Sequence, residues 1–136
     1  MKHKLGFTLI ELLVVISVIG VLISIVAVNF TTAQKQARDS RRKQDILAIQ
    51  NAMEQYFATS GTAEYPDGTN NALAFEAGSI PEDPKSPSMS YDWGTQTTSS
   101  YCICAELETS QGNSIGVGCN WDDTASADHF CVTSQQ

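Results

Sequence analysis

Basic side chains are almost absent from most of the chain, and this scarcity argues against one class of function. Seven of the eight lysines and arginines lie before Gln44, and only Lys85 lies after it. From Gln44 onward, 13 acidic residues accompany that one lysine, and the formal net charge of the 136 residues is −7. General nucleic-acid binders carry a basic excess, so we expect nucleic acid not to be a partner.

Histidine is nearly as scarce, and this limits the catalytic chemistry that the chain can offer. His3 and His129 are the only two histidines. A glycine-rich loop of the kind that cradles phosphates is also missing. We therefore predict that the chain is not an enzyme, with no catalytic residue and no cofactor-binding residue.

Charge is also missing from a long apolar run near the N-terminus. Fourteen of the seventeen residues from Leu12 to Val28 are Leu, Val, Ile or Ala. Counted from Phe7, the segment is about 33 Å long as an α-helix, close to the ~30 Å core of a bilayer. We predict a transmembrane helix over residues 7–30. A cleaved secretory signal is the alternative, but its apolar region would be only about 7–15 residues long.

Glu11 is the one charged residue at the start of this apolar segment. A carboxylate inside a bilayer is costly, so such a residue predicts a function and a partner. Cleavage of the chain after Gly6 would create an ammonium on Phe7, four residues from Glu11 and on the same face of a helix. The carboxylate could also reach the Phe7 amine of a neighbouring copy, which would neutralise both charges only on assembly.

The stretch Lys-Leu-Gly6-Phe7-Thr-Leu-Ile-Glu11-Leu-Leu-Val-Val resembles the class III signal of type IV pilins and type II secretion pseudopilins. The resemblance implies that a prepilin peptidase removes residues 1–6 as a leader and methylates the Phe7 amine. It also implies that Glu11 guides docking into a helical filament, with copies of the chain, other pilin-like subunits and a membrane assembly machinery as partners.

The resemblance implies that the protein crosses the cytoplasmic membrane once and has its C-terminal head on the extracytoplasmic side. After assembly, the subunit would lie in a cell-surface or periplasmic filament. The rival interpretation is a monomeric membrane-anchored extracytoplasmic binding domain that keeps its leader. The lysines and arginines between Lys35 and Lys43 count against this orientation by the positive-inside rule.

The helix is expected to continue beyond the apolar run, over residues 31–60. Ile46, Ile49 and Met53 recur at three- and four-residue steps, which is typical of an amphipathic helix packed on a sheet. The basic cluster Lys35–Lys43 has three interpretations: a solvated helix face, a belt that meets the acidic heads of adjacent subunits, and contact with DNA. We favour the solvated face.

Residues 61–136 are predicted to form a loop and an antiparallel sheet head. Strand signals occur at 89–93, 101–107, 114–119 and 129–132, after a proline-containing loop over 61–87. The predicted fold class is α+β and pilin-like, with one long N-terminal helix, apolar in its first half and amphipathic in its second, on a small sheet.

Four cysteines lie in this head, and we expect them to form disulfides. Three pairings are possible. If a turn centres near Gln111, Cys104 falls close to Cys119, which leaves Cys102 for Cys131, and we favour that pairing.

Metal binding is the rival use of these residues. A Cys-x-Cys pair with two distant cysteines fits zinc spacing poorly, and His129 does not rescue it. Some secretion pseudopilins hold calcium in a head loop, which makes Asp122, Asp123 and Asp128 candidate calcium ligands. The sequence around them does not match an EF-hand, so we favour a solvated acidic loop with no metal.

Overall fold

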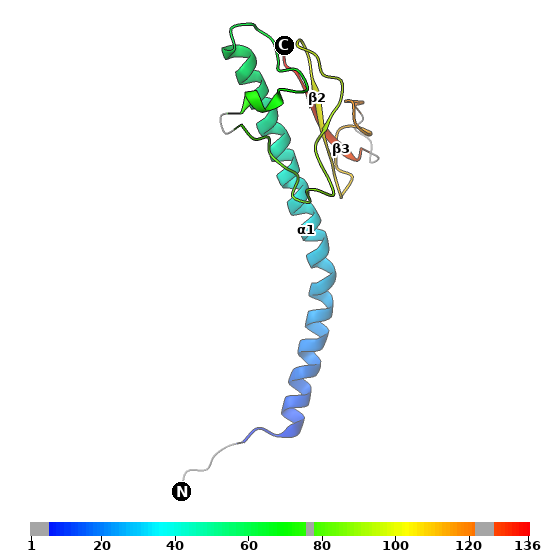
Figure 1. Cartoon of the computed structure of the whole chain (residues 1–136). Coiled ribbons are helices and arrows are strands. Elements are labelled where there is room, and N and C mark those ends of the chain that lie inside the picture. Colours follow the sequence, from blue (N-terminus) through cyan, green and yellow to red (C-terminus); the bar gives the residue numbers. More distant parts are fainter. Residues whose placement is uncertain (1–5, 76–77, 122–126) are drawn as a thin grey trace. The chain divides into compact units, whose positions relative to one another are not determined.

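The computed structural model describes residues 6–75, 78–121 and 127–136, and it does not describe the side chains of residues 25–29. The elements follow the chain as helix α1 (Leu9–Thr59), a 3-10 helix η1 (Asn71–Ala74) and strands β1 (Asp92–Trp93), β2 (Cys102–Glu106) and β3 (His129–Thr133) (Figure 1). The chain divides into two compact units, Met1–Gln34 and Lys35–Gln136.

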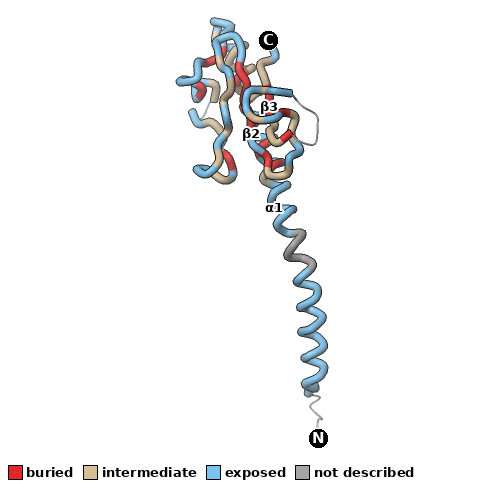
Figure 2. The backbone as a smooth tube through the Cα atoms, turned by 90° about the vertical axis from the view of Figure 1, so that its right-hand side faces the viewer, coloured by how far each residue is buried: buried red, intermediate tan, exposed pale blue. Residues whose placement is uncertain are grey.

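In the unit Met1–Gln34, the residues of α1 whose side chains are described are all exposed, and most of them are apolar (Figure 2). The expected helix is present, but it begins at Leu9 rather than at Phe7. Among the residues whose structure is described, no helical stretch has both the length and the apolar content that crossing a bilayer requires.

In the unit Lys35–Gln136, the C-terminal part of α1 packs against the sheet (Figure 1). Ile46, Ile49 and Met53 are fully buried, as their helical spacing predicts. They form one core with the sheet residues Ile103 and Val132 and with neighbouring aromatic rings. Each large aliphatic side chain buried in this way contributes about 1.5–3 kcal/mol to the free energy of unfolding.

The sheet has the strand order β1-β2-β3, and both pairings are antiparallel. Successive residues of a strand point to opposite faces. Ile103 and Ala105 of β2 therefore belong to the core with the helix, whereas Cys102 and Cys104 point to the opposite face. The α+β class is confirmed, since a helix covers one face of a small antiparallel sheet.

The strand predicted at 114–119 is wrong. Gly116, Gly118 and Cys119 have φ angles of 68°, 103° and 56°, which lie outside the extended region that a strand requires. Only Ser114 makes ladder contacts, as isolated bridges to Trp121 and His129. Of the remaining strands, β1 and β2 are shorter than predicted, and β3 begins where predicted but ends one residue later.

The favoured disulfide pairing is also wrong. The structure joins Cys102 to Cys119 and Cys104 to Cys131. The antiparallel neighbours of β2 are β1 and β3 and not the 114–119 segment. The register with β3 places Cys104 directly opposite Cys131, with their Cα atoms 4.1 Å apart. The 114–119 loop then returns across the same face and brings Cys119 to Cys102.

Candidate functional site

The predicted processing and assembly residues lie at the start of α1, where Thr8 and Glu11 cap the helix. The Thr8 backbone N–H and hydroxyl each donate to the Glu11 carboxylate at 2.8 Å. The Glu11 N–H in turn donates to the Thr8 hydroxyl oxygen at 3.3 Å. This reciprocal arrangement is a capping box, which satisfies backbone N–H groups that a helix start leaves unpaired.

The capping box explains where the helix begins and adds a residue that our sequence analysis missed. Its signal, Thr-x-x-Glu, is visible in Thr8-Leu-Ile-Glu11. Because Thr8 occupies the cap position, Phe7 precedes the helix. The expectation that Phe7 and Glu11 share one helical face is therefore wrong. Phe7 is 93% exposed, and it lines a shallow groove of about 380 Å³ that includes Glu11 and Val14.

Between Leu12 and Ser24, every residue of α1 is exposed, and most of these residues are apolar. Its large aliphatic residues from Leu9 to Ile23 are 47–83% exposed. The hydroxyls of Ser17 and Ser24 donate to the carbonyls of Val14 and Val21, so they need no outside partner. A contiguous apolar surface of this extent marks contact with other proteins or with a membrane.

A second feature, a buried ion cluster at the base of the head, was also missed from the sequence. Arg42 has no exposed surface. Its guanidinium donates to both carboxylate oxygens of Asp83, at 2.6 and 3.1 Å. It also donates to Asp39 at 2.9 Å and to Glu108 at 3.1 Å. One helix residue therefore connects α1, the 79–90 loop and the segment that follows β2.

Glu108 connects this cluster to two further cations. Arg38 donates to both of its oxygens, at 2.6 and 2.8 Å, and Lys85 donates at 2.8 Å. The hydrogen bonds from Arg38, together with those from Lys85 and Arg42, hold the pKa of the Glu108 carboxyl far below its ordinary value, although partial burial acts in the opposite direction. Burial alone would lower the pKa of Arg42, but the bonds to Asp83 and its neighbours keep that pKa above its ordinary value.

The basic cluster of the sequence is therefore only partly a solvated face. Arg38 and Arg42 form ion pairs with Glu108 and Asp83 inside the buried cluster. Arg41 pairs with Asp45 at 2.9 Å, and Lys43 donates to the Gln111 carbonyl. Sequence spacing could not reveal this division, since the acidic partners come from distant parts of the chain.

The candidate calcium ligands do not form a described site. Asp122 and Asp123 lie outside the described residues. Asp128 contacts the His129 ring nitrogen at 2.6 Å and accepts from the Gly116 N–H. The sulfur atoms of Cys102, Cys104 and Cys119 lie within 4.8 Å of one another, but all belong to disulfides and so offer no thiolate to a metal.

One further sequence pattern, Gly112-Asn-Ser114-Ile-Gly116, has the spacing of a hydrolase nucleophile motif. That motif needs an exposed serine on a strand-to-helix turn. Ser114 is instead fully buried in a loop, and its hydroxyl donates to the Asn120 carbonyl at 2.8 Å. The pattern therefore does not define a catalytic serine.

Comparison with known proteins agrees with the N-terminal features. Residues 1–27 match the family described as the prokaryotic N-terminal methylation motif. This match covers the apolar run up to Ala27 together with Gly6, Phe7 and Glu11, the residues singled out for processing and assembly.

The chain is also similar to curated proteins of two kinds. It is 43% identical over 51 residues to the type II secretion system core protein G of Escherichia coli K12, covering 38% of this chain and 35% of that protein. It is 36% identical over 55 residues to the Aeromonas hydrophila core protein G, covering 40% and 38%. It is 35% identical over 77 residues to the type IV major pilin protein PilA of Myxococcus xanthus, covering 57% and 32%.

These matches confirm the resemblance to pilins and pseudopilins that the N-terminal sequence indicates. The chain spans about a third of the length of the curated relatives it matches. No solved structure gives a significant match.

Proposed function

We propose that this protein is a structural, non-enzymatic subunit of a type IV pilus-like or type II secretion pseudopilus filament. The relatives named above are a secretion-system core protein and a major pilin. The observation that carries the proposal is the combination of Glu11 at the start of α1 with apolar side chains exposed around the helix that follows.

The N-terminal sequence suggests how the subunit is prepared. A prepilin peptidase would cut between Gly6 and Phe7, and the Phe7 nitrogen, until then part of an amide, would become an ammonium. N-methylation of that amine would keep its positive charge. An ammonium at the start of α1 meets the positive end of the helix dipole, which is unfavourable unless a carboxylate is close.

Glu11 supplies such a carboxylate, and in the filament we assign it to the Phe7 amine of a neighbouring copy. In the single chain its oxygens accept from the Thr8 N–H and hydroxyl. A carboxylate has about four acceptor positions, so it can keep the cap and still accept a charged donor. Burial of both charges among apolar helices would favour the assembled state only when the pair is complete.

The apolar surface of α1 suits two environments that the subunit would occupy one after the other, first the membrane and then the filament. Before assembly we place residues 7–30 in the cytoplasmic membrane, with the head on the extracytoplasmic side. In the filament, the same side chains would contact the helices of other copies. Both environments remove apolar surface from water, which contributes about 25 cal/mol per Å².

The mass of the mature N-terminus tests this proposal most directly. We expect the purified protein to begin at Phe7 and to carry one methyl group on its amine. The control is Gly6→Trp, which places a bulky ring beside the scissile bond and should leave the leader attached. An intact Met1 on the wild-type protein would favour the monomeric anchored domain instead.

A second experiment separates membrane insertion from assembly. The Glu11→Ala variant should still enter the membrane fraction but give few or no filaments in electron micrographs of sheared surface material. Glu64→Ala is the matched control, because Glu64 is an exposed carboxylate of the head, and this variant should assemble normally. Normal filaments from Glu11→Ala would contradict the docking role of Glu11.

A further inference from the structure

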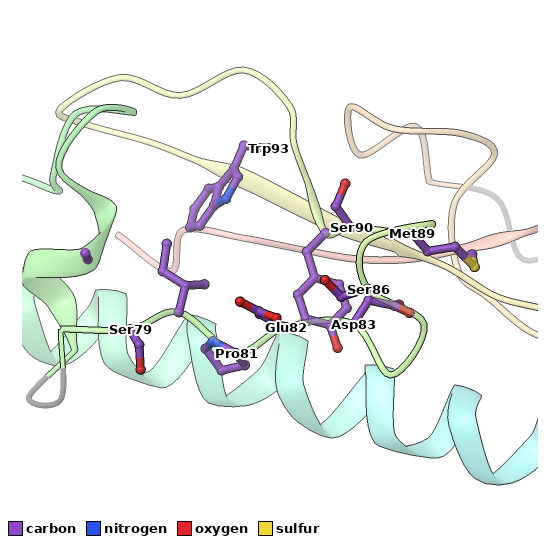
Figure 3. A pocket seen from close by; sticks show the side chains of 11 residues that line it. Ser79, Pro81, Glu82, Asp83, Ser86, Met89, Ser90 and Trp93 are labelled. Atoms are coloured by element: carbon purple, nitrogen blue, oxygen red, sulfur yellow. The ribbon is translucent and has the colours of Figure 1, made fainter.

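A groove in the head has no role in the functions considered above. It has a volume of about 500 Å³ and lies between the 79–90 loop and β1. Figure 3 shows Trp93 on the β1 side, and Pro81, Glu82 and Asp83 on the loop side. The volume is within the usual range of ligand sites, about 300–1,000 Å³.

The walls of this groove are held in place by polar contacts to α1. Asp83 is bound by both arms of the Arg42 guanidinium. The Tyr91 hydroxyl donates to Asp45 at 2.8 Å. These contacts already engage Asp83 and Tyr91, so neither presents an unpaired charge to a ligand.

Glu82 is the carboxylate of the groove that remains available. It is exposed, and no hydrogen bond or ion pair engages it within the described residues. Trp93, on the opposite wall, is half-buried. A carboxylate that shares a groove with an indole ring suits a cationic side chain, because the ring face also attracts positive charge.

The chain carries a cation that matches this groove. Of the basic residues in the unit Lys35–Gln136, Lys35 is exposed and has no ion-pair partner in the part of the chain that the structure describes. Arg38, Arg41, Arg42 and Lys85 are paired with acidic residues of their own chain. Lys43 is engaged by the Gln111 carbonyl and the Phe130 ring.

We propose that the Glu82 groove of one copy binds Lys35 of a second copy of this chain. The inference rests on the proposed filament function and identifies a contact between heads and helices within it. The groove and Lys35 are different surfaces, so the contact is heterologous. A heterologous contact that does not close into a ring repeats as an open helical filament.

Charge complementarity favours a second copy as the occupant, because seven of the eight basic residues precede Gln44 whereas the groove lies in the acidic part of the chain. Beyond Gln44 the chain has 13 acidic residues and one lysine, so most approaches of two heads are repulsive. Docking a helix segment that carries Lys35 onto the groove brings opposite charges together. It also selects one register, since misplaced like charges disfavour other contacts.

Carbodiimide cross-linking of filaments tests this contact at the level of residues. The reagent joins a lysine amine to a carboxylate only when the two are adjacent. Filaments are grown from a mixture of ¹⁴N- and ¹⁵N-labelled full-length chains, cross-linked, digested and analysed by mass spectrometry. We expect a Lys35–Glu82 peptide in which one half carries ¹⁴N and the other ¹⁵N.

Charge exchange tests the same contact by its effect on filament yield. An exposed ion pair changes an affinity by up to about fivefold, and a reversed charge should reduce yield by about tenfold or more. Lys35→Glu and Glu82→Lys should each show this loss, and the double variant should restore most of the yield. Lys35→Glu combined with Glu64→Lys is the matched control and should not restore it.

Each result of these experiments bears on the proposal. A mixed-label Lys35–Glu82 peptide and recovery in the charge exchange support it. Filaments in which Lys35 is joined to another carboxylate, or only within one copy, overturn it and leave the filament function standing. A cross-link from Glu82 to a different protein also overturns it. If the wild-type chain forms no filaments, the filament function and this contact both fail.

Discussion

Replacement of Arg42 by methionine is the sharpest test of how the head is held to α1. The side chain is fully buried and serves three carboxylates, so its removal leaves negative charge without compensation in the interior. Removal of one partner of a buried ion pair typically lowers the free energy of unfolding by about 3–5 kcal/mol. We expect Arg42→Met to fall within that range.

The structure indicates which of the three carboxylates carries this cost. Glu108 keeps Arg38 and Lys85. Asp39 keeps the backbone N–H groups of Glu108 and Thr109 and the Thr109 hydroxyl. Asp83 keeps only the N–H of Lys85 among its described contacts, and its side chain is 2% exposed. The loss should therefore be concentrated on Asp83.

Two comparison variants make the test specific. Arg41→Met removes the neighbouring arginine, whose side chain is 66% exposed, and should cost at most about 1 kcal/mol. In the Arg42→Met background, Asp83→Asn removes the stranded charge and should recover a large part of the loss.

The measurement is thermal unfolding with the disulfides intact. Unfolding is monitored by the fluorescence of Trp93 and Trp121, which both lie in the head. For a unit of about 100 residues, 3 kcal/mol lowers the midpoint temperature by roughly 12–24 °C. If Arg42→Met proves no more destabilising than Arg41→Met, or if Asp83→Asn gives no recovery, the assignment of the cost to a buried charge is wrong.

Three further predictions concern the head. The pKa of Glu108 is depressed in the folded protein. Its contribution to the free energy of unfolding is therefore complete above its unfolded pKa of about 4.3 and is lost as the pH falls below that value. The midpoint of thermal unfolding, measured as the pH is lowered, should show this loss, and Glu108→Gln should reduce the pH dependence. Gly112→Ala should destabilise the head strongly, because the added methyl would overlap the backbone of β3, whereas Gly68→Ala meets only an ordinary contact at 3.5 Å and should be tolerated in a urea titration. Glu54→Ala removes the acceptor of two tyrosine hydroxyls and should cost about 1–3 kcal/mol in the same titration.

Much of the fold could be predicted because it depends on local periodicity. The three-to-four-residue spacing of Ile46, Ile49 and Met53 indicates which side of the helix is buried, whatever covers it. The alternation of residues around Cys102 and Cys104 likewise places both on one face of a strand. By contrast, the segment 114–119 has the composition of a strand, but positive φ angles at its glycines make it a loop.

Pairings between distant parts of the chain could not be predicted in this way. The disulfides depend on which strand lies beside β2, and spacing along the chain does not specify that neighbour. The same holds for Arg42, whose partners Asp83 and Glu108 are 41 and 66 residues away. In the sequence, Arg42 is one of five cations close together, and nothing local separates it from Arg41.

The N-terminal motif of this protein could be recognised from the sequence by itself, because Gly6, Phe7, Glu11 and the apolar run lie next to one another along the chain. Its helix cap is equally local, since Thr8 and Glu11 are three residues apart. Only the tertiary structure decided the disulfide pairing, the burial of Arg42 and the availability of Glu82. Each of these depends on which distant side chains the fold brings within bonding distance, and that is set by strand order and packing.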